Sequence, residues 1–482
     1  MKLKELLQGI RVLECTADME LDIQNVYYDS RKVTEGGLFV AISGFASDGN
    51  RFIPMALSKG AAVIVTAKRP ETAIPYVLVD NDRLALALIG TNFYGHPADS
   101  MTLIGVTGTN GKTSVTLLLK QVIETCLNAK TGLIGTMENL IGSEAIPTER
   151  TTPESFELQG LFARMRDAGC THCIMEVSSH AITLDRVGGV HFDVAAFTNL
   201  TEDHLDFHKT MDAYCDAKAE LFARCDRAVI NVDDNYAPRM LAKAACPVLR
   251  TSAYGADLYA RDTQLHAEGV SFTAVGNGEA AEVVLPIPGR FTVYNALTVL
   301  GIAQQLGISL KDCAEAMKEA HGVKGRIEVV PTPDTDYSVL IDYAHTPDGL
   351  ENVLTSVKDF CRGRLIAVFG CGGDRDPIKR PIMGKIGVKC SDIAIITSDN
   401  PRSEDPNAII EDILTGIQPE DGYYKVVEDR RAAIRYAMDI AEKDDIIVLA
   451  GKGHETYQEI CGVKYHLDER EEVAAHLEEL RK

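Results

Sequence analysis

One short stretch of the sequence combines the residue types that hold a phosphate chain. Gly108–Thr113 (Gly-Thr-Asn-Gly-Lys-Thr) follows the apolar run Leu103–Val106 and precedes apolar residues with helical spacing. Glycines let backbone N–H groups approach an anion, and the positive end of a helix dipole would face the same anion. Lys112 would reach the β- and γ-phosphates, and the Thr113 hydroxyl would ligate Mg²⁺. The stretch therefore predicts an ATP or GTP site.

The glycine spacing of this stretch is shorter than the strict phosphate-loop pattern, because Val106 stands where the first glycine belongs. An ordinary turn between a strand and a helix is the alternative interpretation. The Gly-Lys-Thr triplet in its strand–loop–helix context favours the nucleotide site. The residues expected to surround the phosphates are Thr107, Gly108, Thr109, Asn110, Gly111, Lys112 and Thr113.

Two polar side chains follow later apolar runs and could bind a metal ion beside the phosphates. Glu176 follows the run Cys173–Met175, and His204 lies in a polar loop after Phe192–Phe197. Ligands in an open α/β sheet bind beyond the carboxyl ends of the strands, so both side chains should converge on the phosphate loop. Mg²⁺ prefers oxygen ligands, and a histidine ligand leaves room for Mn²⁺. Either residue alone would be an ordinary solvated side chain, but their shared placement predicts a metal site.

Two cations in the middle of the chain carry less information. Lys218 lies on a predicted helix, and its spacing alone indicates a solvent-facing lysine. Arg326 could pair with a phosphate through its planar guanidinium fork, or it could form a salt bridge at the rim of a domain. The residues by themselves leave both interpretations of Arg326 open.

Charged residues follow three apolar runs in the last third of the chain. Arg375 follows the first run, Asn400 and Arg402 follow the second, and Glu455 follows the third. Arginines suit carboxylates, whereas Glu455 and backbone carbonyls suit an ammonium group, so the set predicts a zwitterionic ligand. The turn Gly370–Gly373 imitates a dinucleotide-binding loop, but Arg375 stands where its last glycine belongs. We therefore reject NAD binding.

Strand and helix patterns alternate through most of the chain, which predicts an α/β protein with mostly parallel sheets. Breaks rich in proline and glycine at 94–100 and 330–336 indicate linkers. We expect three domains: a small α/β domain at 1–99, a central phosphate-loop domain at 100–328 and a Rossmann-like α/β domain at 329–482. Within the central domain, residues 250–285 should form short strands and turns.

The composition excludes several classes of protein. A formal charge of −21 over 482 residues argues against a nucleic-acid partner and against docking on anionic membranes, although local cations still allow anionic substrates. Of the 12 cysteines, only Cys170 and Cys173 are closely spaced, and they indicate a buried strand rather than zinc. Unpatterned thiols, together with the lack of a leader or membrane-length apolar run, predict a cytoplasmic protein without membrane insertion. We expect a monomer.

Taken in order, the motifs of the chain resemble those of the Mur ligases, and the resemblance covers all three predicted domains. Within that family it is to the ligases that add the third peptide residue of peptidoglycan. Each motif alone is weak, but the ordered set is highly specific. The motifs are Gly108–Thr113, Glu176–His180, Thr198–His204, Tyr214–Lys218, Gly325–Arg326, Asp342–Pro347 and Asp399–Arg402.

The resemblance implies an ATP-dependent ligase that uses Mg²⁺ and acts on UDP-N-acetylmuramoyl-L-alanyl-D-glutamate through an acyl phosphate. It implies that the first domain holds the UDP and that Lys218 is carbamylated and supports a second Mg²⁺. Catalysis would rest on Lys112, Glu176, His204, Lys218 and Arg326, with Thr113, Glu176, His204 and carbamylated Lys218 at the metal. Further nucleotide contacts fall on Asn295, Arg326 and Asp342, and nucleotide-sugar contacts fall on Ser30, Thr151, Thr152, Ser178, Arg186 and Lys218.

The resemblance also implies that the incoming amino acid is meso-2,6-diaminopimelate. This compound differs from lysine by one carboxylate, which Arg402 could hold with two hydrogen bonds. With lysine bound, Arg402 would face no anion, and leaving a buried charge unpaired costs about a few kcal/mol. The residues expected around the amino acid are Arg375, Asp399, Asn400, Pro401, Arg402, Gly451 and Glu455.

Other functions stay open from the sequence. The same ligase could use L-lysine, and a ligase similar to folylpolyglutamate synthetase would carry a similar phosphate loop. That second ligase gives no reason for a UDP-holding first domain. A phosphate-loop regulatory ATPase or a binding-only module would not need the arginines and Glu455 of the last domain.

Overall fold

The computed structural model describes residues 1–44, 48–71, 73–148, 150–320 and 322–481. The chain divides into two compact units. Unit 1 comprises Met1–Leu258 and Leu297–Ser309, and unit 2 comprises Tyr259–Ala296 and Leu310–Lys482. The predicted α/β class is confirmed, whereas the domain borders at 99/100 and 328/329 stay predictions.

Unit 1 begins with a five-stranded sheet in the order β1-β5-β4-β3-β2, in which only β1 is antiparallel to its neighbour. Its central strands are apolar and buried because both faces of the sheet are covered. The strands are β1 (Val12–Cys15), β2 (Val26–Tyr27), β3 (Gly37–Val40), β4 (Ala61–Thr66) and β5 (Tyr76–Val79), and the helices are α1 (Leu3–Leu6), α2 (Ile53–Ser58) and α3 (Asp82–Phe93).

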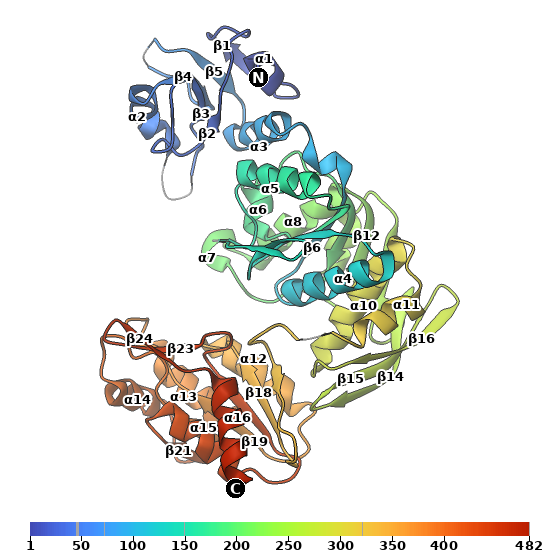
Figure 1. Ribbon diagram of the computed structural model, residues 1–482, viewed down its shortest axis with the longest axis vertical. Coiled ribbons are helices and arrows are strands. Elements are labelled where there is room, and N and C mark those ends of the chain that lie inside the picture. The colour runs from blue at the N-terminus through green and yellow to red at the C-terminus, as the bar shows by residue number, and fades with distance from the viewer. Residues whose placement is uncertain (45–47, 72, 149, 321, 482) are drawn as a thin grey trace. The chain divides into compact units, whose positions relative to one another are not determined.

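A second sheet of unit 1 carries the phosphate loop (Figure 1). Its parallel strands run β13-β12-β11-β6-β10-β7, followed by antiparallel β8 and β9. The strands are β6 (Thr102–Thr107), β7 (Thr131–Ile134), β8 (Asn139–Ile141), β9 (Glu144–Ile146), β10 (His172–Glu176), β11 (Phe192–Phe197), β12 (Cys225–Asn231) and β13 (Val248–Ser252). The helices are α4 (Lys112–Leu127), α5 (Ser155–Asp167), α6 (Ser179–Thr183), α7 (Leu205–His208), α8 (Met211–Ala219) and α9 (Ala237–Lys243).

The register of this sheet aligns the loops that were predicted to converge. Glu176 at the end of β10 pairs with Val106 of β6, and Phe197 at the end of β11 pairs with Thr107. The loops after β6, β10 and β11 therefore leave the sheet at one edge. The chain order also reverses beside β6, which is where open α/β sheets bind ligands.

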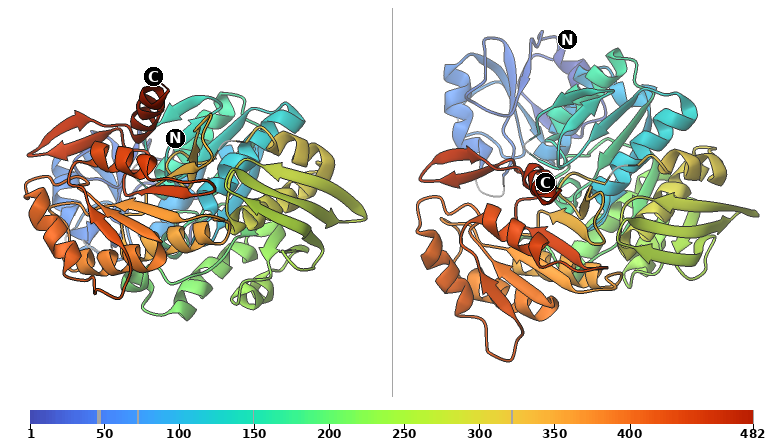
Figure 2. Two further views of the ribbon diagram at one scale, coloured as in Figure 1. Left: turned by 90° about the horizontal axis from the view of Figure 1, so that it is seen from below. Right: turned by 60° about the horizontal axis from the view of Figure 1, so that its bottom comes forward.

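Unit 2 begins with three antiparallel strands, drawn in yellow-green in Figure 2, which form one twisted layer. They are β14 (Leu258–His266), β15 (Gly269–Gly276) and β16 (Glu279–Leu285), so the prediction of short strands for this segment was wrong in length. Burial alternates along β15 and β16 with the period of two of a strand that has one covered face, and α11 (Leu310–Met317) packs on β16. Helix α10 (Arg290–Gln305) follows the layer.

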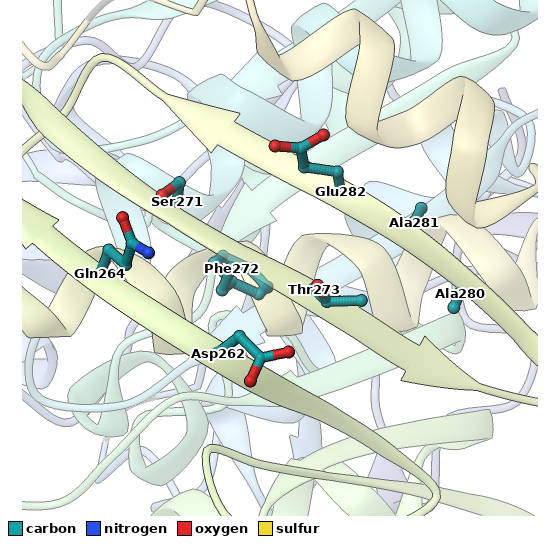
Figure 3. A pocket seen from close by; sticks show the side chains of 8 residues that line it. All are labelled: Asp262, Gln264, Ser271, Phe272, Thr273, Ala280, Ala281 and Glu282. Atoms are coloured by element: carbon teal, nitrogen blue, oxygen red, sulfur yellow. The ribbon is translucent and has the colours of Figure 1, made fainter.

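A hollow of about 350 Å³ lies against strands β14–β16 and is drawn in Figure 3. Its lining mixes Asp262, Gln264 and Glu282 with hydroxyl and apolar side chains of β15 and β16. The lining contains none of the residues singled out by the sequence, and we assign the hollow no function.

The remainder of unit 2 is a six-stranded sheet in the order β17-β18-β22-β19-β20-β21, parallel except for β17. The strands are β17 (Glu328–Val330), β18 (Ser338–Asp342), β19 (Leu365–Phe369), β20 (Ile393–Ile396), β21 (Tyr424–Val426) and β22 (Ile446–Ala450), and a hairpin, β23 (Tyr457–Ile460) and β24 (Val463–His466), follows β22. The helices are α12 (Pro347–Lys358), α13 (Lys379–Cys390), α14 (Pro406–Leu414), α15 (Arg430–Asp439) and α16 (Glu469–Leu480).

Alternate residues of this sheet face two separate cores. Leu340, Ala367 and Val448 pack with α12, α13 and α14, whereas Val339 and Leu449 pack with α15 and α16. Helices thus cover both faces, as predicted for a Rossmann-like domain. Val368 of β19 pairs with Leu449 of β22, and Phe369 of β19 pairs with Ile396 of β20, so the loops that carry the predicted amino-acid residues leave the sheet at one edge.

Two further predictions concern the cysteine pair and membrane-spanning helices. Cys170 and Cys173 are buried free thiols, and Cys173 lies on β10 as predicted. Among the residues that the structure describes, no helix is both long and apolar enough to cross a membrane.

Candidate active site

The phosphate loop packs tightly against the end of β11. Gly108 and Gly111 have φ angles of 151° and 87°, which glycine adopts most readily. A Cβ atom on Gly108 would lie 1.9 Å from Thr198 Oγ1, and Thr198 Oγ1 also donates to Asn110 O at 2.7 Å. Gly111 is the N-cap residue of α4. It has no side chain that could accept a hydrogen bond from the first N–H groups of this 16-residue helix. The loop therefore fits a phosphate group.

Glu176 is held beside the start of α4. Its Oε1 accepts hydrogen bonds from Thr113 Oγ1 at 2.9 Å and from Thr136 N at 3.0 Å, and Oε2 accepts from Thr136 Oγ1 at 3.0 Å. The side chain is almost fully buried at 1% exposure. Two predicted metal ligands, Thr113 and Glu176, thus present oxygen atoms to one another, which suits the preference of Mg²⁺.

Lys218 is buried, so the interpretation of a solvent-facing lysine was wrong. It is 1% exposed on α8, where its Nζ donates to Gly108 O at 2.9 Å and lies 4.7 Å from the ring centre of Tyr214. Lys112 Nζ also donates to Gly108 O, at 2.8 Å. Burial first, and the charge of Lys112 second, lower the pKa of Lys218 well below its ordinary value.

His204 lies among other rings near Lys218. Its ring centre is 4.8 Å from that of His180 and 6.1 Å from that of Tyr214, and its side chain is 45% exposed. Within the described parts of the chain, no three His, Cys, Asp or Glu side chains form a group that could hold a metal ion. Besides Glu176, a metal at this site would therefore need oxygen ligands from Thr113, from a modified Lys218 or from phosphates.

The residues predicted to contact the muramoyl-dipeptide gather around the end of β10. Thr152 Oγ1 donates to Glu176 O at 2.8 Å and lies 3.4 Å from Ser178 Oγ, while Arg186 Nη1 donates to Thr152 O at 3.2 Å. Thr151 joins the same group through a hydrogen bond of 3.0 Å between its Oγ1 and that of Thr136. Glu176 therefore contacts both the predicted nucleotide residues and the predicted dipeptide residues.

A buried carboxylate that the sequence did not single out holds Arg186. Glu154 Oε1 lies 3.0 Å from Arg186 Nε, Glu154 Oε2 lies 3.3 Å from Arg83 Nη1, and the Glu154 side chain is 8% exposed. Burial lowers the pKa of Arg186. Glu154 follows Thr151 closely in the sequence, but Arg186 lies much further along the chain. Their contact could therefore have been expected only from the fold.

The other predicted contacts to the nucleotide and to UDP are spread over both units. In unit 1, Ser30 is buried and its Oγ lies 3.3 Å from Met55 Sδ. In unit 2, Asn295 is buried on α10, Arg326 is exposed, and Asp342 accepts hydrogen bonds from the backbone N–H groups at 327 and 344 at 2.8 Å each. Burial raises the pKa of Asp342.

The predicted amino-acid residues gather at the edge of the C-terminal sheet. Asn400 Nδ2 donates to Glu455 Oε2 at 2.9 Å, and a Cβ atom on Gly451 would lie 2.5 Å from Asp399 Oδ2. Asp399, Asn400 and Pro401 are buried, whereas Arg375 is exposed and donates to Asp374 O. Glu455 and Asn400 are thus in contact, as the zwitterion hypothesis requires.

Arg402 corrects the electrostatic part of that hypothesis. Its Nε lies 3.3 Å from Glu459 Oε2, and its Nη1 donates to Gly373 O at 2.8 Å. The Arg402 side chain is 21% exposed, so it is not fully buried, and Glu459 is an anion beside it. The expectation that a bound lysine would leave Arg402 facing no anion was wrong, because Glu459 comes from a hairpin that local spacing does not connect to residue 402.

Three family profiles match the chain in order. The profile described as "Mur ligase family, catalytic domain" matches residues 22–94, "Mur ligase middle domain" matches 106–303, and "Mur ligase, glutamate ligase domain" matches 325–453. The motifs noted above lie inside the second and third of these matches.

Full-length relatives and solved structures agree with the profiles. A curated relative from Clostridium tetani, named UDP-N-acetylmuramoyl-L-alanyl-D-glutamate--2,6-diaminopimelate ligase, is 47% identical over all of both chains. A solved structure of a protein with that name is 32% identical, has a TM-score of 0.79 and covers 100% of this chain and 99% of its own. Mycobacterium tuberculosis folylpolyglutamate synthase, complexed with ADP and AMPPCP, covers 76% of this chain and 92% of its own at 20% identity and a TM-score of 0.59, which shows the fold alone.

Proposed function

Because the chain belongs to the Mur ligase family, we propose that it is an ATP-dependent ligase that joins meso-2,6-diaminopimelate to UDP-N-acetylmuramoyl-L-alanyl-D-glutamate. This reaction is what the printed names of its full-length relatives describe. A cytoplasmic location and a monomeric state stay predictions.

One contact carries the proposal from the structure. Glu176 accepts a hydrogen bond from Thr113 at the phosphate loop through its side chain, and from Thr152 through its main-chain carbonyl. A nucleotide on the loop and a carboxylate near Thr152 would therefore lie on either side of a single residue. A ligase that activates a carboxylate with ATP needs this proximity.

The residues of this site suit the first half of the reaction. Bound ATP would supply the phosphoryl group that turns the D-glutamyl carboxylate into an acyl phosphate. Lys112 would hold the phosphates, and the N-terminus of α4 would orient them. Two anions must approach one another, so the positive charge of Lys112 would lower the barrier.

The metal site draws on the same residues. Thr113 and Glu176 would supply oxygen ligands to Mg²⁺, which when bound neutralises phosphate charge. We further propose that Lys218 is carbamylated, because a buried amine with a lowered pKa is neutral enough to attack CO₂ and because the product carries carboxylate oxygens. His204 would complete the group or orient the modified Lys218.

The C-terminal site suits the second half of the reaction. Arg402 would bind the extra carboxylate of diaminopimelate with the N–H groups that Gly373 and Glu459 leave available. Glu455 and the carbonyls around it would hold an ammonium group. The amine that attacks the acyl phosphate must be neutral, and we assign no general base for its proton.

L-Lysine is the second candidate substrate, because Glu459 already compensates Arg402 when the extra carboxylate is missing. The test is an ATP-dependent assay that offers the purified UDP-sugar dipeptide with diaminopimelate or lysine in parallel and measures phosphate release. We expect release that needs both partners and is faster with diaminopimelate. Release without either partner would favour a regulatory ATPase, and equal rates would remove the selectivity.

A further inference from the structure

A lysine that the sequence hypotheses did not use lies at the centre of the predicted amino-acid site. Lys452 follows β22 and is 0% exposed. Its Nζ lies 3.1 Å from Asn400 Oδ1, 3.4 Å from Glu455 Oε2 and 3.7 Å from Asp399 Oδ1. A single buried ammonium group thus contacts three residues predicted to surround the substrate.

The contacts of Lys452 fix the orientation of the Asn400 amide. Its Oδ1 accepts from Lys452 Nζ and also from Glu459 N, at 2.9 Å, so the oxygen faces the β23–β24 side. Its Nδ2 must then face Glu455, to which it donates at 2.9 Å. A flipped amide would place N–H groups against an ammonium group and a backbone N–H. Lys452 and the backbone N–H of Glu459 therefore determine together which way Asn400 points.

The charges around Lys452 explain why a cation is needed here. Arg430 forms a fully buried ion pair with Glu469, at 2.7 Å. The carboxylates of Asp399 and Glu455 remain, and Lys452 is the cation that contacts both. Of these five groups, Glu455 has the most exposed side chain, at 15%. These five groups are two cations, Arg430 and Lys452, and three carboxylates, so one negative charge is not compensated within the group. Because Glu455 is the most exposed of the carboxylates, it is the position that could meet a substrate ammonium group.

We propose that Lys452 is a positioning residue for the incoming amino acid, acting through Asn400 and Glu455. It does not touch the substrate, because no part of it reaches solvent. It holds Asn400 in one orientation and places a positive charge between Glu455 and Asp399. This inference rests on the proposed function, since it assigns Glu455 to an amino-acid site.

The test is Lys452→Met, which keeps the length of the side chain and removes its charge. We expect KM for diaminopimelate to rise about ten- to a hundredfold, the usual effect of losing hydrogen bonds to a charged group. KM for ATP and for the UDP-sugar should change less than about twofold, because the loss is local. Lys452→Arg should restore much of the loss, because it keeps the charge.

The matched control is Lys464→Met. Lys464 is exposed on β24 and lies 4.0 Å from the ring centre of Tyr457, which Lys452 also faces, at 5.8 Å. We expect this variant to keep the KM of the wild type for diaminopimelate. A similar rise of KM in both variants would assign the effect to Tyr457 and overturn the role of Lys452.

A double substitution separates positioning from simple stabilisation and covers a Lys452→Met protein that fails to fold. In the Glu455→Gln variant a neutral amide replaces one of the carboxylates that face Lys452. Adding Lys452→Met to this variant should therefore raise KM for diaminopimelate less than about threefold further. An undiminished additional rise would overturn the inference. If the wild type is active and Lys452→Met has the same KM for diaminopimelate as the wild type, the inference alone is overturned. If the wild type is inactive with every amino acid, the proposed function and this role are overturned together.

Discussion

The phosphate loop and the C-terminal site differ in how their positive charges are compensated. At the phosphate loop, Lys112 Nζ donates to the carbonyls of Gly108 and Thr109, which are neutral groups that compensate a cation only partly. At the C-terminal site, Lys452 and Arg430 lie against carboxylates. The first site is therefore built for ligands that bring negative charge, and the second is balanced for a ligand that carries both signs.

This difference separates two kinds of defect. Changes at the phosphate loop should reduce the reaction with every amino acid, because the activation of the carboxylate precedes the choice of amine. Changes at the C-terminal site should alter the response to the amino acid and leave ATP and the UDP-sugar largely unaffected. The predictions below test that separation.

The largest effect is expected for Lys218→Ala. We expect kcat to fall on the order of a thousandfold or more with both diaminopimelate and lysine, because an electrostatic contact at the reacting groups is lost. Short-chain carboxylic acids added to the assay should restore part of the activity by filling the vacated space. The exposed residue Lys243, substituted by Ala, is the control and should leave kcat unchanged. Near-normal turnover of Lys218→Ala would show that no carbamate is needed.

Arg402→Ala should separate the amino acids. We expect kcat/KM for diaminopimelate to fall about a hundredfold, since the extra carboxylate loses a charged hydrogen-bonding partner, while kcat/KM for lysine changes less than about threefold. Parallel assays at saturating ATP measure both values. Equal losses for the two amino acids would remove Arg402 from a role in specificity.

Glu154→Gln tests the side of the phosphate loop that faces the dipeptide. Removing the charge that holds Arg186 and Arg83 should raise KM for the UDP-sugar dipeptide about five- to tenfold, with KM for the amino acid unchanged. Glu144→Gln, at an exposed ion pair with Arg164, is the control. A change in KM for diaminopimelate would contradict the separation of the two sites.

The smallest effect concerns stability and pH. Burial first, and then the neighbouring His180 and Lys218, lower the pKa of His208 to about 4. The unfolded chain takes up this proton near pH 6.5, so His208 contributes full stability above that pH and loses it progressively as pH falls towards 4. In His208→Asn, the loss of Tm between pH 7 and pH 4.5 should shrink by about 2 °C. His191→Asn, at an exposed ion pair, should not change it.

The sequence predicted the features that depend on contiguous residues. The glycine loop, the strand before it and the helix after it form one local unit, and the positions of Glu176 and Asp399–Arg402 at strand ends follow from alternating strands and helices. The meeting of Thr113 with Glu176 needed only the parallel order of the strands.

Other features depend on contacts between distant parts of the chain. The burial of Lys218 results from packing of α8 beside a loop 110 residues earlier, and spacing on a helix cannot reveal it. Lys452 and Asn400 are 52 residues apart, and the charge of Glu459 beside Arg402 arises from a hairpin that returns to that loop. Such charge balance is a property of the folded domain and leaves no local pattern.

Arg402 adopts a left-handed backbone conformation with a φ angle of 51°, which is unusual for a residue other than glycine. The hairpin holds it there: Arg402 N donates to Glu459 O at 3.0 Å, and Arg402 O accepts from Cys461 N at 2.7 Å. A chimaera that imports residues 399–402 from a ligase of different selectivity would place new side chains on a main chain still fixed by the old hairpin. An exchange of specificity therefore has to transplant residues 457–466 together with those four positions.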